Sequence, residues 1–147
     1  MLARLWPEDM VAPLWQRRTG AAPIGSNDLV WSILSEADVV LSHRVSAVIV
    51  LAGVTQGTAE DLHLNTTLAQ AGCRLAQRLG VKALVASSQA VYGRQTGVLR
   101  ETDTPTPATP YGQAKRDMEQ AISGRADVTC LRIGNVAGCD GLFQAMA

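Results

Sequence analysis

Tyr111 and Lys115 are the residues whose types and spacing most clearly indicate chemistry. They lie four positions apart, so on a helix the phenol and the ammonium share one face. A free tyrosine has a pKa of about 10 and is a poor base at neutral pH, but a nearby cation favours the phenolate. Ser87 and Ser88 follow the apolar run 83–86, and a serine hydroxyl there could hydrogen-bond the reacting oxygen. The set suits proton transfer to a carbinol or carbonyl.

These side chains must be positioned by a strand and a helix. The short apolar run 83–86 is typical of a buried parallel strand, and both serines fall where that strand would emerge. Open α/β sheets place their chemistry at this edge. Pro110 is expected to start the helix that carries Tyr111 and Lys115, because proline is tolerated in a first helical turn.

Three further elements are predicted around this pair. Buried strands are expected at 47–53 and 128–133, and a helix is expected at 60–79, ended by Gly80. Its apolar stripe should pack against the core. The stripe comprises Leu64, Leu68, Gly72, Leu75 and Leu79.

The first forty residues carry weaker patterns. The apolar stretch 10–15 predicts a strand that ends in Arg17 and Arg18, and a loop at 21–27 is indicated by its Pro, Gly, Ser and Asn content. The stretch 31–40 has a weak helical pattern. These elements would precede the strand at 47–53.

Four motifs occur together in an order that resembles the extended short-chain dehydrogenase/reductase family, in its NAD-dependent epimerase/dehydratase branch. The resemblance runs from about 47 to 138. Tyr-x-x-x-Lys alone would be a weak signal, but its combination with the other motifs is specific. The motifs are Ser87-Ser88-x-x-Val91-Tyr92-Gly93, Glu101 with proline-rich sequence, Tyr111-x-x-x-Lys115, and Leu131-Arg132-x-x-Asn135-Val136-x-Gly138.

The resemblance implies an α/β fold: a partial, Rossmann-like, doubly wound parallel sheet over 1–147 as one incomplete NAD(P)-binding domain. The family begins with a strand and a glycine-rich turn that approaches the cofactor's pyrophosphate. No such glycine pattern precedes Met10. The family also continues beyond this length with a substrate domain. We therefore expect a chain truncated at both ends relative to the family.

The resemblance also implies roles for individual residues. Tyr111 would be the general acid/base, Lys115 would lower the tyrosine's pKa and hold the nicotinamide ribose, and Ser88 would orient the reacting oxygen. Cofactor contacts are expected from Leu51, Ala52, Gly53, Asn65, Tyr111, Lys115 and Gly134, and substrate contacts from Ser88, Gln89 and Asn135. Sugar dehydratases of the family usually carry an acidic pair where this chain has Gln89-Ala90. This departure favours an epimerase or simple reductase.

Arg17 and Arg18 bear on the choice between NAD and NADP. In a dinucleotide-binding fold the end of the second strand faces the adenosine ribose, where an arginine accommodates a 2′-phosphate. If the predicted strand holds that place, the two arginines favour NADP as cofactor. The alternative is a pair of solvated surface arginines, since short basic pairs are common on surfaces.

Composition excludes several other classes of protein. The 147 residues are 47% hydrophobic and 18% charged with zero formal net charge, which is typical of a soluble globular chain and offers no electrostatic footprint for nucleic acid or anionic membrane. No signal peptide or membrane-length apolar segment is present. Cys73, Cys130 and Cys139 lack metal or redox spacing, which fits a reducing cytoplasm. No metal site is predicted.

Two functions from different classes remain open. The first is an NAD(P)-dependent epimerase or reductase that acts on a nucleotide sugar or a related hydroxyl or carbonyl substrate, with homodimerisation through the helices at 60–79 and 111–121 as in relatives. The second is a catalytically inactive fragment or binding module of the same fold, because a missing pyrophosphate cradle removes several hydrogen bonds to charged oxygens, each worth about 1.5–3 kcal/mol.

Overall fold

The computed structural model describes residues 13–17, 28–35, 41 and 45–135. The chain forms two compact units, 1–42 and 43–147. In the first unit, β1 (Trp15–Arg17) pairs in parallel with β2 (Asp28–Val30). The strand predicted from Met10 and ending in the two arginines is therefore confirmed only in part, since β1 ends at Arg17 but residues 13 and 14 are not strand. β2 was not predicted.

The weak helical pattern at 31–40 predicts a helix that begins near Ser32 or Ser35, and no helix begins at Ser32. Residues 33–35 form a turn and a bend, which Ser35 closes by donating from both its backbone N–H and its hydroxyl to the Ser32 carbonyl. Serine side chains that bond nearby backbone in this way compete with helix formation. The remainder of this prediction, at 36–40, and the loop at 21–27 lie outside the described residues.

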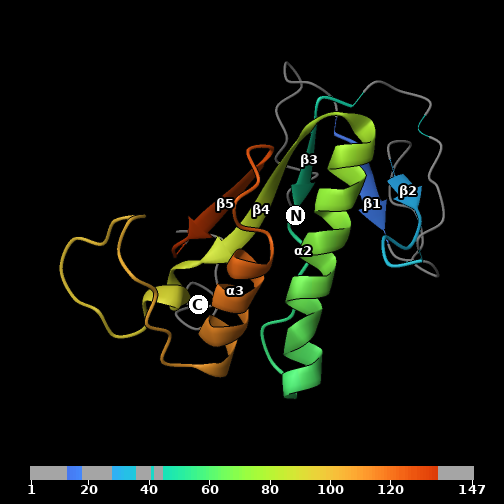
Figure 1. Ribbon diagram of the computed structural model, residues 1–147. Coiled ribbons are helices and arrows are strands. Elements are labelled where there is room, and N and C mark those ends of the chain that lie inside the picture. Colours follow the sequence, from blue (N-terminus) through green and yellow to red (C-terminus); the bar gives the residue numbers. More distant parts are fainter. Residues whose placement is uncertain (1–12, 18–27, 36–40, 42–44, 136–147) are drawn as a thin grey trace, which may run out of the picture. The chain divides into compact units, whose positions relative to one another are not determined.

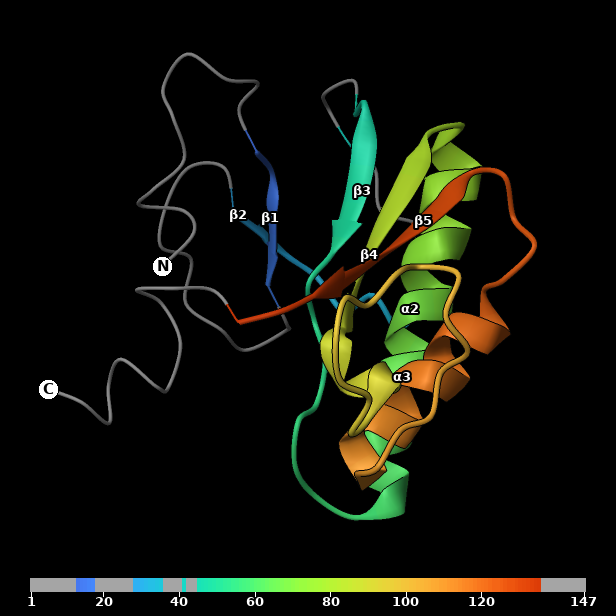
Figure 2. The ribbon, with the colours of Figure 1, turned by 90° about the vertical axis from the view of Figure 1, so that its left-hand side faces the viewer.

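The second unit is a three-stranded parallel sheet with two helices. Its strands are β3 (Ala47–Val50), β4 (Lys82–Ser88) and β5 (Val128–Ile133), in the order β3-β4-β5. Helix α2 (Ala59–Leu79) connects β3 to β4, and α3 (Pro110–Ala121) lies between β4 and β5 in sequence. Figures 1 and 2 show both helices on the same face of this sheet. All three strands therefore present their carboxyl ends at one edge.

Helix α2 is fixed at both ends by its sequence. Thr58 caps the N-terminus and forms a reciprocal capping box with Asp61, while Gly80 ends the helix in the left-handed conformation at φ 66°, as predicted. The leucine stripe, however, is not the most buried face. Leu64 is 38% exposed, whereas small residues such as Ala69, Cys73 and Ala76 are fully buried.

Close approach between helix and sheet explains that difference. A Cβ placed on Gly72 would lie 2.3 Å from Val50 Cγ2, so glycine is required where α2 crosses β3. Small residues on this face let the backbones approach, and larger side chains are displaced to its margins. The core that results is a single cluster. It comprises Val50, Ala69, Cys73, Ala76, Ala83, Val85, Met118 and Ile122.

The predicted strands β4 and β5 are confirmed, and the strand at 47–53 is confirmed only in part. It ends at Val50, and Ile49 is 50% exposed because alternate residues face away from the helices. Leu131 and Ile133 of β5 share that outward orientation and are 44% and 40% exposed. No helix in the described part of the chain is long and apolar enough to cross a membrane.

Candidate functional site at the carboxyl edge of the sheet

Ser88 is the last residue of β4, so its hydroxyl lies at the carboxyl edge of the sheet, as predicted. The chain then turns into a short 3-10 helix, η1 (Gln89–Tyr92). The Ser88 Oγ caps this helix by accepting a hydrogen bond of 3.2 Å from the Ala90 N–H. The side chain is half-buried, and the hydroxyl proton remains available to a ligand oxygen.

The helix that carries Tyr111 packs directly on this turn. Pro110 occupies its first turn, and Thr109 caps it by accepting from the Gly112 N–H at 3.0 Å. A Cβ placed on Gly112 would lie 2.4 Å from the Ala90 carbonyl oxygen. Glycine after Tyr111 thus allows α3 to approach η1, and the structure brings the tyrosine's segment against the turn that Ser88 begins.

Lys115 lies one helical turn after Tyr111 and is buried. Its Nζ donates to the Ala86 carbonyl of β4 at 2.9 Å and lies 3.9 Å from the Met118 sulfur. The same ammonium is 5.9 Å from the centroid of the Tyr111 ring, within reach of a weak cation–π contact. Burial lowers the pKa of Lys115, although the charge of Glu119 opposes this effect in part.

The turn after β3 completes this group of residues. Asn65, buried on α2, donates to the Val54 carbonyl at 2.8 Å and accepts from the Val54 N–H at 3.2 Å. A Cβ placed on Gly53 would lie 2.7 Å from Asn65 Oδ1 and 3.3 Å from Lys115 Nζ. Asn65 therefore holds the bare backbone of Gly53 beside the ammonium. The neighbouring residues Leu51 and Ala52 are exposed.

The predicted substrate contacts Gln89 and Asn135 meet at the ends of β4 and β5. Gln89 Nε2 donates to Asn135 Oδ1 at 3.5 Å, a long hydrogen bond. A Cβ placed on Gly134 would lie 3.2 Å from Gln89 Oε1. All three residues are exposed, so two neutral amides stand together at the same edge as Ser88.

Arg17 is already engaged within the first unit. Its Nε lies 2.8 Å from Asp28 Oδ2, and the aspartate side chain is only 2% exposed. Arg18 lies outside the described residues. This ion pair engages the Nε of Arg17, and the predicted preference for NADP is not shown.

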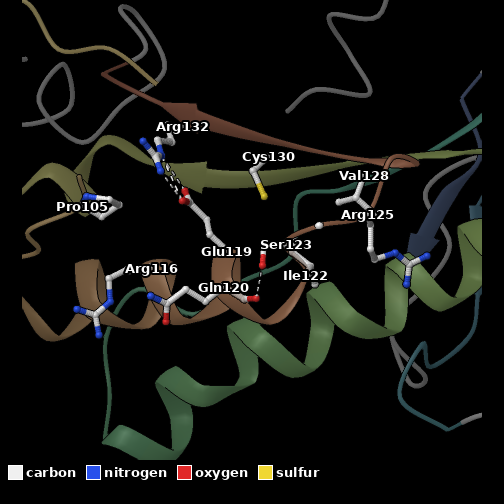
Figure 3. Close-up of a pocket in the computed structure, with 11 residues that line it drawn as sticks. Pro105, Arg116, Glu119, Gln120, Ile122, Ser123, Arg125, Val128, Cys130 and Arg132 are labelled. Atoms are coloured by element: carbon white, nitrogen blue, oxygen red, sulfur yellow. Dashed lines mark hydrogen bonds and ion pairs between the residues drawn. The ribbon is translucent and has the colours of Figure 1, made fainter. Parts of the chain in front are cut away.

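A polar network of Ser87, Tyr92, Glu119 and Arg132 lies beside the predicted site. Arg132 donates to both carboxylate oxygens of Glu119 and to the Tyr92 hydroxyl, and the Ser87 hydroxyl donates to Glu119. Figure 3 shows Arg132 of β5 and Glu119 of α3 directed at each other. They line an open groove of about 410 Å³ that does not include Ser88, Tyr111 or Lys115. Tyr92 and Arg132 carried the resemblance, but their spacing gives no sign of contact.

Among the described residues, no cluster of three or more histidine, cysteine, aspartate or glutamate side chains could hold a metal ion. His63 of α2 is exposed, and Cys73 and Cys130 are free thiols. His43 and Cys139 lie outside the described residues. The polar groups of the predicted catalytic residues are the Ser88 hydroxyl, the Tyr111 phenol and the Lys115 ammonium.

A parallel sheet with connecting helices on one face defines the class: a partial Rossmann-like α/β fold. The family model described as "NAD dependent epimerase/dehydratase family" matches residues 15–144. The chain belongs to the NAD-dependent epimerase/dehydratase family. No match was found among curated proteins.

Solved structures agree with this membership. "MoeE5 in complex with UDP-glucose and NAD" is 28% identical with a TM-score of 0.56, over 71% of this chain and 40% of that one. UDP-N-acetylglucosamine 4-epimerase from Bacillus cereus is 27% identical with a TM-score of 0.52, over 60% and 38%. RMD from Pseudomonas aeruginosa, complexed with NADPH, is 25% identical with a TM-score of 0.54, over 64% and 37%. The chain thus spans about two fifths of the length of these neighbours.

Proposed function

We propose that this chain carries the acid/base half of an NAD(P)-dependent epimerase or reductase acting on a nucleotide sugar. The observation that carries the proposal is the placement of Lys115. Its buried ammonium lies over the Tyr111 ring, beside the bare backbone of Gly53. A structural lysine would be expected to find a carboxylate or to reach water. This one is fixed on a carbonyl at the edge where α/β sheets place their ligands.

In the proposed mechanism, Tyr111 takes a proton from a substrate hydroxyl or returns one to a carbonyl. Lys115 favours the phenolate electrostatically, because the cation lies close to the ring in a poorly solvated environment. Ser88 uses its free hydroxyl proton to orient the same substrate oxygen. When bound, a nicotinamide cofactor would supply the hydride acceptor or donor.

The described residues fit the nicotinamide side of such a cofactor. Leu51, Ala52 and Gly53 are exposed where β3 ends, and a side chain at Gly53 would collide with Asn65. Backbone without a side chain permits close approach of a ligand. Lys115 would then donate to ribose hydroxyls with the protons that Ala86 does not use. Gly134 offers a second bare backbone position at the same edge.

Substrate class is proposed from the neighbours and from Gln89. The neighbour MoeE5 is described in complex with UDP-glucose and NAD, and a related proton-transfer site here would accept a sugar hydroxyl. Gln89 and Asn135 are neutral amides, which can bind a sugar but cannot donate or remove a proton at neutral pH. We therefore favour epimerisation or carbonyl reduction over dehydration.

Fluorescence titration of the folded chain with NADH and, separately, NADPH tests cofactor binding. Saturation at micromolar concentration would support the proposal, and the cofactor that binds more tightly would decide between NAD and NADP. A preference for NADPH would support the role predicted for the two arginines. No saturation up to millimolar cofactor would instead support the inactive fragment or binding module.

Tyr111→Phe tests the catalytic assignment in a chain that binds cofactor. Loss of the phenolic hydroxyl should lower turnover of UDP-glucose about 10²–10⁴-fold, the contribution typical of general acid/base catalysis. Affinity for NADH should be unchanged, because the ring and Lys115 remain. Turnover equal to that of the unaltered chain would remove Tyr111 from the mechanism.

Homodimerisation through α2 and α3 is proposed from the resemblance alone. Leu64 of α2 is 38% exposed, which would suit a place at a helix interface. Light scattering of the purified chain distinguishes one copy from two. A monomer at all accessible concentrations would exclude this arrangement for the chain.

A further inference from the structure

The ion pair between Glu119 and Arg132 lies apart from the proton-transfer group and has no part in the proposed mechanism. The two side chains are 12% and 18% exposed. Arg132 Nη2 donates to Glu119 Oε2 at 2.8 Å, and its Nε donates to both carboxylate oxygens at 3.1 and 3.2 Å. This two-point geometry links α3 rigidly to β5. The pKa of Arg132 is raised, chiefly by its hydrogen bonds to the Glu119 carboxylate.

The remaining donors of Arg132 extend to the long connection at 94–109. Its Nη1 donates to the Glu101 carbonyl at 3.2 Å and to the Tyr92 hydroxyl at 2.9 Å. The Tyr92 hydroxyl in turn donates to the Arg100 carbonyl at 2.9 Å. One guanidinium thus holds two consecutive carbonyls of the connection, one directly and one through a tyrosine.

The same network reaches the strand that ends in the site serine. Ser87 donates from its hydroxyl to Glu119 Oε1 at 2.5 Å, and Ser88 is the next residue. Tyr92 ends the 3-10 helix that follows, and its carbonyl accepts a hydrogen bond of 3.1 Å from the Thr106 hydroxyl. Glu119 therefore contacts both the end of β4 and, through Arg132, the connection.

Stability alone is a weak explanation for such a pair. Taking two charges out of water costs free energy that their attraction only about repays, so a well-packed apolar pair of similar volume is often as stable. What an apolar pair lacks is directed donors. Arg132 supplies donors aimed at Tyr92 and Glu101, which fix where the connection lies.

We propose that Glu119 and Arg132 are positioning residues that hold the connection at 94–109 beside the Ser88 end of β4, and thereby set the affinity for the nucleotide-sugar substrate without touching it. The inference rests on the proposed function, which assigns Ser88, Gln89 and Asn135 to the substrate side. It adds a requirement that the connection be held in place before substrate binds.

Hydrogen exchange and ligand binding test the inference together. In Glu119→Gln, Arg132 loses its anionic partner, so amides of the segment 94–109 should exchange about tenfold faster or more, since hydrogen bonds to charged groups are worth that much. Affinity of the NADH-loaded chain for UDP-glucose should fall by about the same factor. Affinity for NADH itself should stay within about twofold, because no cofactor contact is altered. Peptides from α2 report whether the fold is intact.

Two further variants keep the result interpretable. Asp127→Asn breaks the exposed pair with Arg125 and should leave exchange at 94–109 and both affinities unchanged. The double variant Glu119→Gln with Arg132→Met removes both charges, so it avoids a lone buried cation if the single variant does not fold. It still lacks the donors to Tyr92 and Glu101, so the connection should exchange as fast as in the single variant.

Unchanged exchange at 94–109 in a folded variant would overturn the inference. So would faster exchange with unchanged affinity for UDP-glucose, because the connection would then be held for some other purpose. A wild-type chain that binds neither NADH nor UDP-glucose removes the proposed function and the substrate part of the inference. In that case the exchange result still decides whether the pair positions the connection.

Discussion

Lys115 and Arg132 are both cations of the second unit, and they differ in their partners and in the direction of their pKa shifts. Lys115 donates to one carbonyl, contacts a sulfur, and has no carboxylate within ion-pair distance among the described residues. Arg132 has a bidentate carboxylate, a tyrosine hydroxyl and a carbonyl. Burial lowers the pKa of Lys115, whereas hydrogen bonds raise that of Arg132.

The difference separates two uses of a buried positive charge. A cation whose charge is not cancelled by an anion retains an electrostatic field that can act on a neighbouring phenol or on a ligand. A cation whose donors are all directed at protein groups fixes the geometry of those groups. Lys115 suits the first use and Arg132 the second, although their helix and strand pack on each other.

Removing the partner of Arg132 should have the largest effect on stability. Glu119→Leu leaves a guanidinium without its carboxylate in a largely buried place, which should lower the free energy of unfolding by about 3 kcal/mol. Adding Arg132→Met removes the unpaired charge and should restore most of that loss. Urea unfolding of both variants measures the comparison. A single variant as stable as wild type would mean that water solvates Arg132 in place of the carboxylate.

Cys130 tests whether Lys115 has a hidden counterion. It is half-buried on β5, and burial first, then the Glu119 carboxylate, raise its pKa to about 11. The thiol should therefore be neutral at pH 7 and leave the ammonium without an anion. Thiolate is the reactive form, so alkylation by iodoacetamide should be about 100-fold slower in the folded chain than in urea. A rate faster in the folded chain than in urea would identify Cys130 as a thiolate that pairs with Lys115.

Lys115→Met should change the pH dependence of stability. Because the native pKa is lowered, the unfolded chain binds more protons between that value and 10.5, and wild-type stability should rise with pH through this window. The methionine variant should lose the rise, because methionine carries no titratable group. Urea midpoints at pH 7 and above measure this. Lys82→Met, at an exposed strand residue, is the control and should behave as wild type. A rise that persists in Lys115→Met would assign it to another group.

Asp127→Asn should have the smallest effect. The Arg125–Asp127 contact is as short as any ion pair in the second unit, at 2.7 Å, but both side chains are about one third exposed. Solvent screening makes such surface pairs nearly neutral for stability. An unchanged urea midpoint is expected at low and high salt. A clearly lower urea midpoint would show that the Arg125–Asp127 pair stabilises the fold despite its exposure, as the Glu119–Arg132 pair is expected to do.

Elements near the site could be predicted because local chemistry determines them. The apolar run before Ser87, Pro110 at the first turn of α3 and Gly80 after α2 each constrain the backbone on their own. The corresponding elements follow the predictions closely. In the first unit, β1 begins later than predicted and β2 was not predicted. Strands of three residues are too short to show a hydrophobic periodicity.

Packing and polar contacts between distant residues could not be predicted in the same way. The buried face of α2 depends on how closely the helix crosses Val50, which hydrophobicity does not report. Arg132 reaches Tyr92 and Glu101 across long sequence separations, and no spacing rule covers such pairs. The roles of Ser88, Tyr111 and Lys115 remain predictions that the titrations and variants above would test.

Gly93 has a consequence for how this fold can diversify. Its φ of 64° and the 2.0 Å that would separate a Cβ from the Thr106 carbonyl place the two ends of the connection against each other. The residues between them form a loop whose two ends lie close together. Doubling the length of such a loop adds only about 0.6 kcal/mol of closure entropy. Insertions there can vary from one homologue to another while the Tyr111 helix and the sheet are inherited unchanged.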